Sequence, residues 1–474
     1  MIKKIDQYIA GMSKRRFFIT AFFLLLLFWL PAWLALYPGT FGYDAPDQFW
    51  QYCGGKHWSS HHPVLHTFVM GYIIDETFII TQDNNDGLAI YSALQGLLSA
   101  WALAKSFSFL HRTKKIPNVL LLVLFLWTAC NPNIQVLTFA ATKDVVFGAF
   151  FVCFMVRFLD ALADRMEETQ KGRGRSVFSA VLLFLDGYLA CMMRNQGIYI
   201  MLAALILLLL SDRKHLHQKE IRQALIIMGL VCLSVFGTGK FVANVLQIPG
   251  GNPREMLSVP MNQLAYTAKL DLEGTEDTMS EEELQQLETF LSEDAIRSYE
   301  ADTADPVKSR FDTEAFLADA AANVRLYLQV GLHHPAHYLK ALGGLIVPYW
   351  RMSLNRYRFL SMTFSFSDQY YFFRIQRRSK LIPYYNYLFK TVVEQEGIIY
   401  RLIAGIFSAS WTTWILCFLT VFGLVRKKRD VLLTILLPGL YFGTCLLGPM
   451  ALLRYLYPML LAAPLLAGSL FRDR

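Results

Sequence analysis

The sequence has few charged residues for its length, and this shortage excludes an ordinary soluble protein. Only 17% of its 474 residues are charged, whereas 54% are hydrophobic, and the mean hydropathy is +0.34. A soluble chain of this size needs more charge to cover its surface. The sequence therefore predicts an integral membrane protein.

Cysteine is also scarce. The seven cysteines are scattered, and four of them fall inside apolar runs: Cys153, Cys191, Cys232 and Cys417. Their spacing matches neither a zinc site nor a disulfide framework. The sequence also lacks an internal repeat or a low-complexity tract. These absences leave the apolar runs as the main guide to the fold.

The first apolar run, residues 17–37, carries no charge. A helix needs roughly 20 apolar residues to cross the hydrocarbon layer, where the backbone finds no other hydrogen-bond partner. The run is too long for a signal peptide and lacks a small-residue cleavage site, so we expect an uncleaved first span. Further apolar runs begin near residues 87, 116, 137, 176, 197, 222, 398, 431 and 452.

The basic residues predict the topology. They gather in six stretches, at residues 3–16, 111–115, 164–175, 212–222, 426–429 and 472–474. Short loops rich in Lys and Arg face the cytoplasm, so two spans should separate successive stretches. This gives about ten spans with both termini inside. The net charge of +8 is explained by these loops, and no nucleic-acid partner is expected.

Two apolar segments would break this pattern if they crossed the membrane. Residues 64–80 carry His66, Asp75 and Glu76, which are costly in lipid. We therefore expect an amphipathic helix at the outer interface there, and a peripheral or re-entrant segment at residues 337–350.

The predicted fold is an all-α polytopic membrane protein with a partly helical extracytoplasmic cap. We expect an N-terminal transmembrane module at 1–242, which includes a first outer loop at 38–86. The cap follows at 243–397, and C-terminal transmembrane helices at 398–474. Within the acidic part of the cap, Ser280 and Glu283 form a capping box that predicts a helix start.

The first outer loop carries the most informative residues. Pro38-Gly39 breaks the first helix, and Asp44 and Asp47 follow at the membrane surface beside Tyr43. His61 and His62-Pro63 come next. An acidic pair alone is a weak signal. An acidic pair at bilayer depth, followed by a His-Pro pair and an interfacial helix, is more specific.

Other polar residues should reach the same face. They come from three further elements: Lys143 and Asp144, Arg194 and Asn195, and Arg454 and Tyr455. We expect Lys143 and Asp144 about two turns inside their span. Each group also has an ordinary explanation, namely a self-neutralising pair, a hydrophilic turn and a snorkelling arginine. The predicted topology nevertheless places all of them at one depth.

Such a cluster suits a lipid-linked phosphate, whose headgroup lies at the interface. Arg and Lys bind phosphate oxygens, and a carboxylate can accept a proton from an attacking hydroxyl. These roles together fit group transfer from a polyprenyl-phosphate donor to an acceptor on the outer face.

The chain resembles the GT-C superfamily of integral membrane glycosyltransferases. The acids followed by His62-Pro63 look like a motif of the protein O-mannosyltransferase and aminoarabinose-transferase-like branch. The motifs closest to an uncharacterised bacterial family of that superfamily are PG-x-x-x-YD at 38–44, TKD at 142–144, RNQG at 194–197 and RYLYP at 454–458.

The resemblance implies roles for these residues. Asp44 would be the catalytic base or orient the acceptor, and Asp47 would share or support that role. Lys143, Arg194 and Arg454 would hold the donor phosphate. The family's acids are often adjacent, whereas Ala45-Pro46 separates them here. A divalent cation, with His61 or His62 as ligand, stays an alternative to no cofactor.

The implied partners are a polyprenyl-phosphate sugar, membrane lipid and an acceptor in the cell envelope: a polysaccharide, teichoic acid, glycolipid or protein. The implied location is the cell membrane, with the active site outside. A secondary transporter or flippase is the alternative, with Asp186 and Lys240 as its best residues. Such a protein should place charges and broken helices at the midplane, often in repeated halves. A third alternative, a non-enzymatic membrane scaffold, would not explain Asp44, Lys143 and Arg194.

Overall fold

The computed structural model describes residues 2–113, 116–163, 173–211, 218–276, 278–352 and 372–471. Within these residues the regular elements are helices, and two isolated bridges are the only β-type pairings. Seven helices are long and apolar enough to cross a membrane, or eight if one bent pair is a single span, and two shorter apolar helices lie at residues 177–193 and 197–211. The predicted all-α polytopic class is confirmed.

The chain packs as two units, which are described separately. The first comprises Met1–Pro249, Met352–Phe442 and Leu453–Arg474, and the second comprises Gly250–Arg351 and Gly443–Leu452. The longer segment of the second unit therefore ends at Arg351, before the predicted cap boundary at 397. The reason is that α19 (Ile382–Phe389) packs against α2 (Lys14–Leu36) of the first unit.

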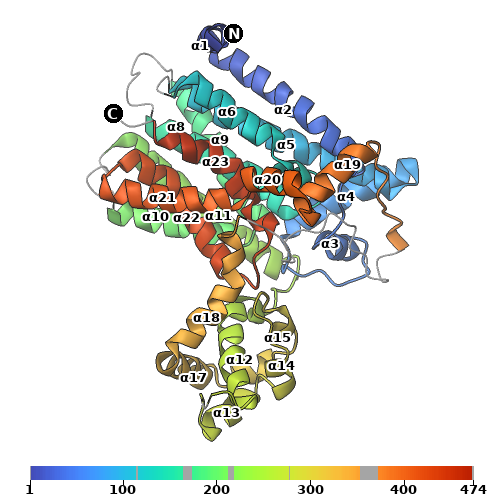
Figure 1. The fold of residues 1–474 in the computed structure, drawn as a ribbon, viewed down its shortest axis with the longest axis vertical. Helices are drawn as coiled ribbons and strands as arrows, with labels where there is room; N and C mark the ends of the chain where they lie inside the picture. The colour runs from blue at the N-terminus through green and yellow to red at the C-terminus, as the bar shows by residue number, and fades with distance from the viewer. Residues whose placement is uncertain are drawn as a thin grey trace. The chain divides into compact units, whose positions relative to one another are not determined.

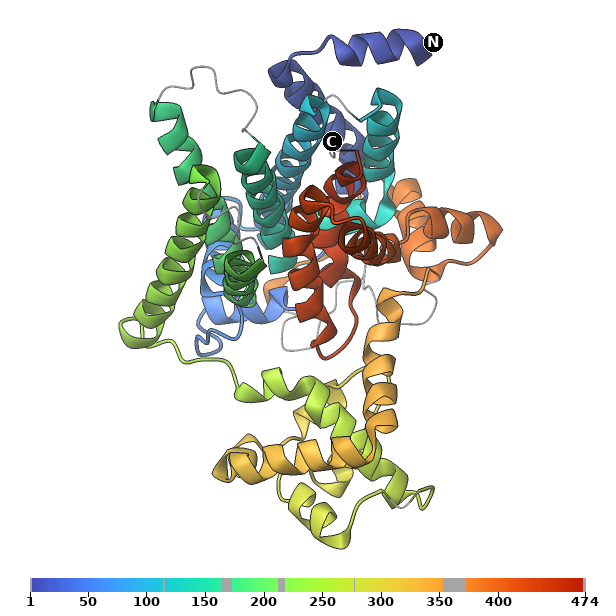
Figure 2. The same ribbon diagram turned by 90° about the vertical axis from the view of Figure 1, so that its left-hand side faces the viewer.

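The first unit is a bundle of helices (Figures 1 and 2). Its N-terminal half contains α1 (Ile2–Ala10), α2, α3 (Ala45–Tyr52), α4 (Val64–Thr81), α5 (Asn84–Arg112), α6 (Asn118–Cys130), α7 (Pro132–Thr138), α8 (Lys143–Ala163), α9 (Arg173–Met193), α10 (Gly197–Ser211) and α11 (Lys219–Asn244). Its C-terminal part contains α19, a π-helical turn (Lys390–Glu394), α20 (Ile398–Ile406), α21 (Ser410–Val425), α22 (Arg429–Leu446), a 3-10 turn (Leu453–Leu456) and α23 (Tyr457–Ser469).

The helix α5 is the centre of this bundle. It packs against α2, α4, α8 and α23, and 18 of its 29 residues are buried. Two of its glycines allow the close approach: a Cβ at Gly87 would lie 2.6 Å from the Ile74 Cα, and one at Gly96 would lie 2.7 Å from the Phe139 ring. Because glycine has no side chain to collide with these neighbours, α4 and the α7–α8 link can lie directly on α5.

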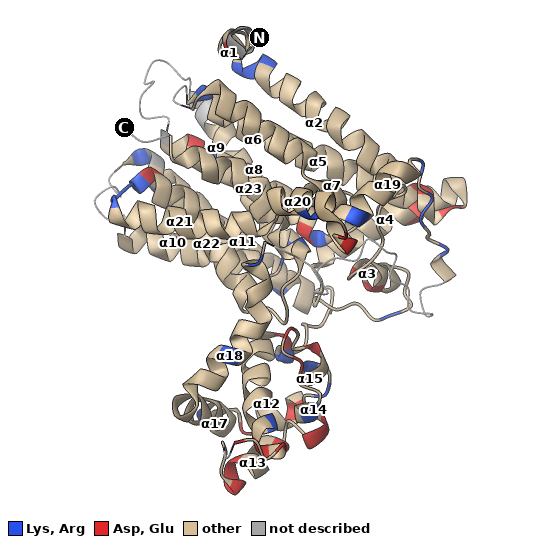
Figure 3. Ribbon diagram, viewed as in Figure 1, with Lys and Arg blue, Asp and Glu red and all other residues tan. Residues whose placement is uncertain are grey.

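The two ends of the bundle differ in charge. At one end, Arg112 of α5 pairs with Asp160 of α8, and the His111 ring stacks on Phe17 of α2. At the other end of α8 stands Lys143, about 25 Å away at a helical rise of about 1.5 Å per residue. This distance is close to the thickness of a bilayer's hydrocarbon core. Between these ends charges are few (Figure 3), and Lys105, Arg157 and Asp186 form one group there.

Helix α4 is long and apolar enough to cross a membrane. Its contacts, however, are made with the first turns of α5: the His66 ring bonds to the Tyr91 hydroxyl, and Ile74 touches Gly87. Phe68, Tyr72 and Ile79 on its outer face are exposed, so α4 has no single polar face. The expected amphipathic pattern is therefore wrong, because exposed apolar side chains share the outward surface of α4 with the exposed Glu76.

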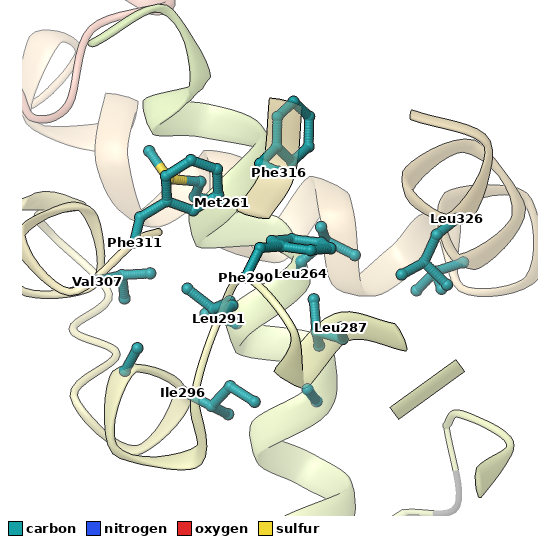
Figure 4. Packing of buried hydrophobic residues seen from close by; sticks show 14 of the residues in the cluster. Met261, Leu264, Leu287, Phe290, Leu291, Ile296, Val307, Phe311, Phe316 and Leu326 are labelled. Atoms are coloured by element: carbon teal, nitrogen blue, oxygen red, sulfur yellow. The ribbon is translucent and has the colours of Figure 1, made fainter. Parts of the chain in front are cut away.

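The second unit has its own core. It contains a 3-10 turn (Pro253–Leu257), α12 (Ser258–Leu272), α13 (Glu281–Glu288), α14 (Glu293–Arg297), α15 (Asp305–Ser309), α16 (Thr313–Ala318), α17 (Ala320–His333), α18 (Pro335–Ile346) and a second 3-10 turn (Val347–Tyr349). Phe290, Phe311 and Phe316 meet over α12 (Figure 4). The predicted capping box is confirmed, since Ser280 and Glu283 bond to each other's backbone at the start of α13.

Candidate active site

Two loops meet in parallel at the charged end of the first unit. The backbone NH of Thr40 donates to the Phe139 carbonyl at 2.9 Å, and the NH of Ala141 donates to the Thr40 carbonyl at 2.9 Å. Gly39 makes this approach possible, since its φ of 123° is unsuited to other residues and its α-carbon lies against Ser92. The short pairing holds the segment leading to Asp44 beside the segment leading to Lys143.

This pairing also sets the start of α8. The helix begins at Lys143 itself, because Phe139 to Thr142 form the extended link between α7 and α8. Lys143 and Asp144 therefore lie in the first turn of α8 and not two turns inside it. The expected depth was wrong, because the pairing with the distant Thr40 interrupts an apolar run that reads as continuous helix.

We define the ionic cluster as seven side chains brought together at this end of the bundle: Asp44, Asp47, His62, Lys143, Asp144, Arg194 and Arg454. They come from the start of α3, the loop before α4, the start of α8, the turn after α9 and the turn before α23. Up to 410 residues separate partners that touch. All seven were named from the sequence.

Asp44 is the centre of the ionic cluster. The Lys143 ammonium lies 2.8 Å from its Oδ2, and the Arg454 guanidinium binds both oxygens, at 3.0 and 3.3 Å. Burial would raise the pKa of Asp44, but the charges of Arg454 and Lys143 hold that pKa well below its usual value. The Asp44 carboxylate is therefore ionised and doubly paired.

His62 connects the two acids of the loop. The Lys143 ammonium lies 3.1 Å from its Nδ1, and Asp47 Oδ2 lies 3.4 Å from its Nε2. An ammonium has only protons to give, so Nδ1 accepts and the ring proton is on Nε2, facing Asp47. Lys56 also binds Asp47, at 2.7 Å. The bond from His62 and the charge of Lys56 hold the pKa of Asp47 below its usual value.

Asp144 and Arg194 form the buried side of the ionic cluster. The Asp144 carboxylate is fully buried and pairs with the Arg194 guanidinium, while Arg454 Nε lies 3.7 Å away. Removing one partner of such a pair costs about 3–5 kcal/mol, because the other charge is then buried alone. Arg454 therefore joins Asp44 to this inner pair.

Aromatic rings surround the two arginines. The Arg454 guanidinium lies over Tyr43 at 4.5 Å and over Tyr455 at 5.1 Å, and Arg194 lies over Tyr455 at 5.0 Å and over Tyr441 at 5.3 Å. Tyr43 adopts a left-handed backbone with φ of 54°, which costs about 1–3 kcal/mol in a residue other than glycine. The rings fix the cations while leaving them charged.

The remaining predicted residues hold the loop. Asn195 donates from Nδ2 to the carbonyls of Ser60 and His61, at 3.0 and 3.2 Å. The His61 ring stands edge-on to His62 at 4.5 Å. The RNQG turn therefore positions the histidine loop over the ionic cluster.

The sequence analysis did not identify three residues that support the ionic cluster, namely Lys56, Tyr441 and Gln48. Lys56 lies in the same loop as Asp47 and could have been found there, whereas Tyr441 lies in an apolar run. Gln48 of α3 bonds to His66 at 3.1 Å, and Tyr91 bonds to the other ring nitrogen at 2.7 Å. His66 is thus a buried structural residue, and it fixes the direction in which α3 presents Asp47.

A divalent cation fits this donor set poorly. Asp44 already faces two cations and Asp47 faces Lys56 and His62, so a metal would have to displace them. Within the described residues, no group of three or more His, Cys, Asp or Glu side chains is arranged to hold a metal.

Comparisons with known proteins give a family but no activity. The family described as "Family of unknown function (DUF6020)" matches residues 54–474. No curated protein sequence matches the chain. Among solved structures, the chain is similar to ArnT from Cupriavidus metallidurans bound to undecaprenyl phosphate, with 13% identity, 96% of this chain and 78% of that chain covered, and a TM-score of 0.33.

Proposed function

We propose that this chain, which belongs to the DUF6020 family of unknown function, is a membrane glycosyltransferase that uses a polyprenyl-phosphate-linked sugar and transfers it to an acceptor in the cell envelope. The observation that carries the proposal is the ionised Asp44 carboxylate held between Lys143 and Arg454. A candidate base, Asp44, is then in direct contact with two cations that could bind a phosphate, at one end of the membrane bundle.

The charges of the bundle support an outward-facing site. The opposite end carries the basic stretch of α2 and Arg112, and basic residues next to spans favour the cytoplasmic side. The ionic cluster would then lie on the outer face, where a lipid-linked donor exposes its phosphate and the acceptor arrives. Both termini would be cytoplasmic.

The proposed reaction is a displacement at the anomeric carbon of the donor sugar. The acceptor hydroxyl oxygen attacks that carbon, the bond from the carbon to the phosphate oxygen breaks, and polyprenyl phosphate leaves with the electron pair. The hydroxyl proton passes to Asp44. Lys143 and Arg454 stabilise the charge that grows on the leaving phosphate, and Arg194 holds Arg454 in place through Asp144.

The pairing of Asp44 explains how donor binding prepares the base. A carboxylate whose pKa is held well below its usual value is a weak base. A bound phosphate competes with Asp44 for Lys143 and Arg454. When it takes those cations, the pKa of Asp44 rises towards its ordinary value, so the base becomes effective only in the presence of the donor.

The proposal is tested with purified full-length protein in lipid and a panel of polyprenyl-phosphate sugars. We expect one donor to release free polyprenyl phosphate in the presence of a cell-envelope extract as acceptor source. Release from none of the donors, by protein shown to be folded, would contradict the proposal. It would favour the transporter alternative, for which Asp186, bound by Arg157 at 2.5 Å and near Lys105 at 4.0 Å inside the bundle, is the relevant residue.

The same assay tests the need for a metal. We expect release to be unchanged by about 5 mM EDTA, a chelator concentration far above trace metal, because Asp44 and Asp47 are neutralised by side-chain cations. The measurement is the initial rate with EDTA and after adding back Mg²⁺ or Mn²⁺. A loss of at least tenfold that either metal restores would show that the cation pairs open to admit an ion.

A further inference from the structure

A basic strap crosses the outside of the first unit. We define it as residues 372–380, with the sequence FFRIQRRSK. Phe373 and Ile375 point inward and are buried, whereas Arg374, Arg377 and Lys380 are exposed. The two buried side chains hold the strap on an apolar surface, and Arg374 between them adopts a left-handed backbone with φ of 53°.

The strap is anchored through its backbone. The Asn84 and Asn85 side chains donate to the carbonyls of Phe373 and Arg374, at 2.9 and 3.1 Å, and Asn85 accepts from the NH of Gln376. The NH groups of Arg378 and Lys380 donate to the carbonyls of Tyr37 and Leu34, each at 2.8 Å. The last two bonds satisfy carbonyls that the end of α2 leaves free. The backbone of the strap is therefore held without using the side chains of Arg374, Arg377 or Lys380.

Three of the four cations in the strap are not paired with an acid in the part of the chain that the structure describes. Arg378 pairs with Asp83, but within the described residues Arg374, Arg377 and Lys380 make no ion pair. Instead the Arg377 guanidinium lies 3.9 Å above the Tyr385 ring and the Lys380 ammonium 5.1 Å above Tyr37. The strap thus presents three cations that form no ion pair with a described residue, and its basic residues are visible as blue stretches on the chain leading into α19 (Figure 3).

The place of these charges is unusual. They lie at the end of α2 that leads into Asp44, opposite the basic stretch that begins α2, so they do not belong to the basic loops that orient the spans. Phe373 touches Phe49 of α3 with ring centres 4.6 Å apart, and both join one apolar cluster with Phe41 and Ile74. The strap is therefore packed directly on the helix that follows Asp44.

We propose that the strap is a separate binding site for phosphoryl oxyanions presented at the level of the lipid headgroups. Exposed guanidinium groups on a rigid backbone suit phosphate, since they offer paired donors and lose little freedom on binding. The phosphoryl group can come from an anionic phospholipid or from a freely diffusing phosphate. This site is distinct from the ionic cluster, whose cations already hold carboxylates, and it does not depend on transfer activity.

The test measures lipid binding to the full-length protein by native mass spectrometry. The variant is Arg374→Gln/Arg377→Gln/Lys380→Gln, which keeps every backbone anchor and both buried side chains. The matched control is Arg310→Gln/Arg325→Gln/Lys340→Gln, which removes three cations from the second unit. We expect wild type and control to prefer phosphatidylglycerol over phosphatidylcholine, and the strap variant to lose about tenfold in phosphatidylglycerol affinity.

A second arm identifies the source of the phosphoryl group. Competition by millimolar inorganic phosphate would assign a freely diffusing phosphate, and binding that inorganic phosphate leaves unchanged would assign the lipid. If the variant fails to fold, wild type is measured at low and high salt, where the preference should collapse because exposed charges are screened. A strap variant that keeps the wild-type preference, or a preference insensitive to salt, would overturn the proposal.

Discussion

Replacing Asp44 by Asn should reduce sugar transfer by about 10²–10⁴-fold, the contribution of a positioned general base. The amide has nearly the same shape but cannot take the proton of the acceptor hydroxyl. It also leaves Lys143 and Arg454 without their carboxylate, so donor binding should survive or even improve. The measurement is kcat for release of polyprenyl phosphate, together with the affinity for the donor.

Two variants separate chemistry from folding. Asp6→Asn removes one acid from α1, at the other end of the bundle, and should keep the wild-type rate. Asp44→Glu keeps a carboxylate and should recover part of the activity. Size-exclusion profile and thermal unfolding show whether Asp44→Asn is intact, since unpaired Lys143 and Arg454 are expected to lower its stability. Normal turnover by an intact Asp44→Asn protein would remove this residue from catalysis.

The ionic cluster could be predicted from the sequence because the predicted topology places residues that are distant in the chain on the same side of the membrane. Apolar runs mark the spans, and basic loops mark one side of them. Lys143, Arg194 and Arg454 must then reach the other side together with Asp44. Charges near spans are costly unless paired, so residues of opposite sign at one depth were expected to meet. The structure brings them together, whereas their roles in transfer stay predictions.

The pairing within the ionic cluster could not be predicted. Sequence placed Lys143 beside Asp144 as a neighbouring pair, but Lys143 turns to Asp44 and Asp144 turns to Arg194. The side chains of adjacent residues on a helix point about 100° apart, so Lys143 and Asp144 contact different neighbours. The loop at Thr40 places Asp44 next to Lys143, and the sequence does not show how that loop is arranged in space.

The strap was missed for a related reason. The strap is held by its own backbone groups, such as the Arg374 carbonyl, which accepts from the Asn85 side chain 289 positions away. Bonds to backbone groups leave no pattern in the side chains of the strap. The boundary of the second unit shows the same limit. The sequence predicts one segment between spans at 243–397, yet α19 packs against α2 of the first unit.

Replacing Arg454 by Gln should lower kcat/KM by about 10²–10³-fold, the cost of removing one preorganised donor to a developing oxyanion. Arg454 is buried and binds Asp44 with two nitrogens while its Nε faces Asp144. Lys at this position would keep the charge but lose the two-pronged contact, so Arg454→Lys should fall between wild type and Arg454→Gln. The measurement is donor-dependent release at several donor concentrations.

The pH profile of Arg454→Gln tests why the loss occurs. A base must be ionised, so kcat/KM falls as the pH drops through the pKa of Asp44 in the free enzyme. Arg454 contributes the largest charge that lowers this pKa. Its removal raises the pKa of Asp44, and the acid limb of the profile should therefore move to higher pH. Arg401→Gln, which removes a cation of α20 outside the ionic cluster, should leave the limb in place. An equal loss of rate at every pH, with no movement of the acid limb, would mean that Arg454 binds the donor without tuning Asp44.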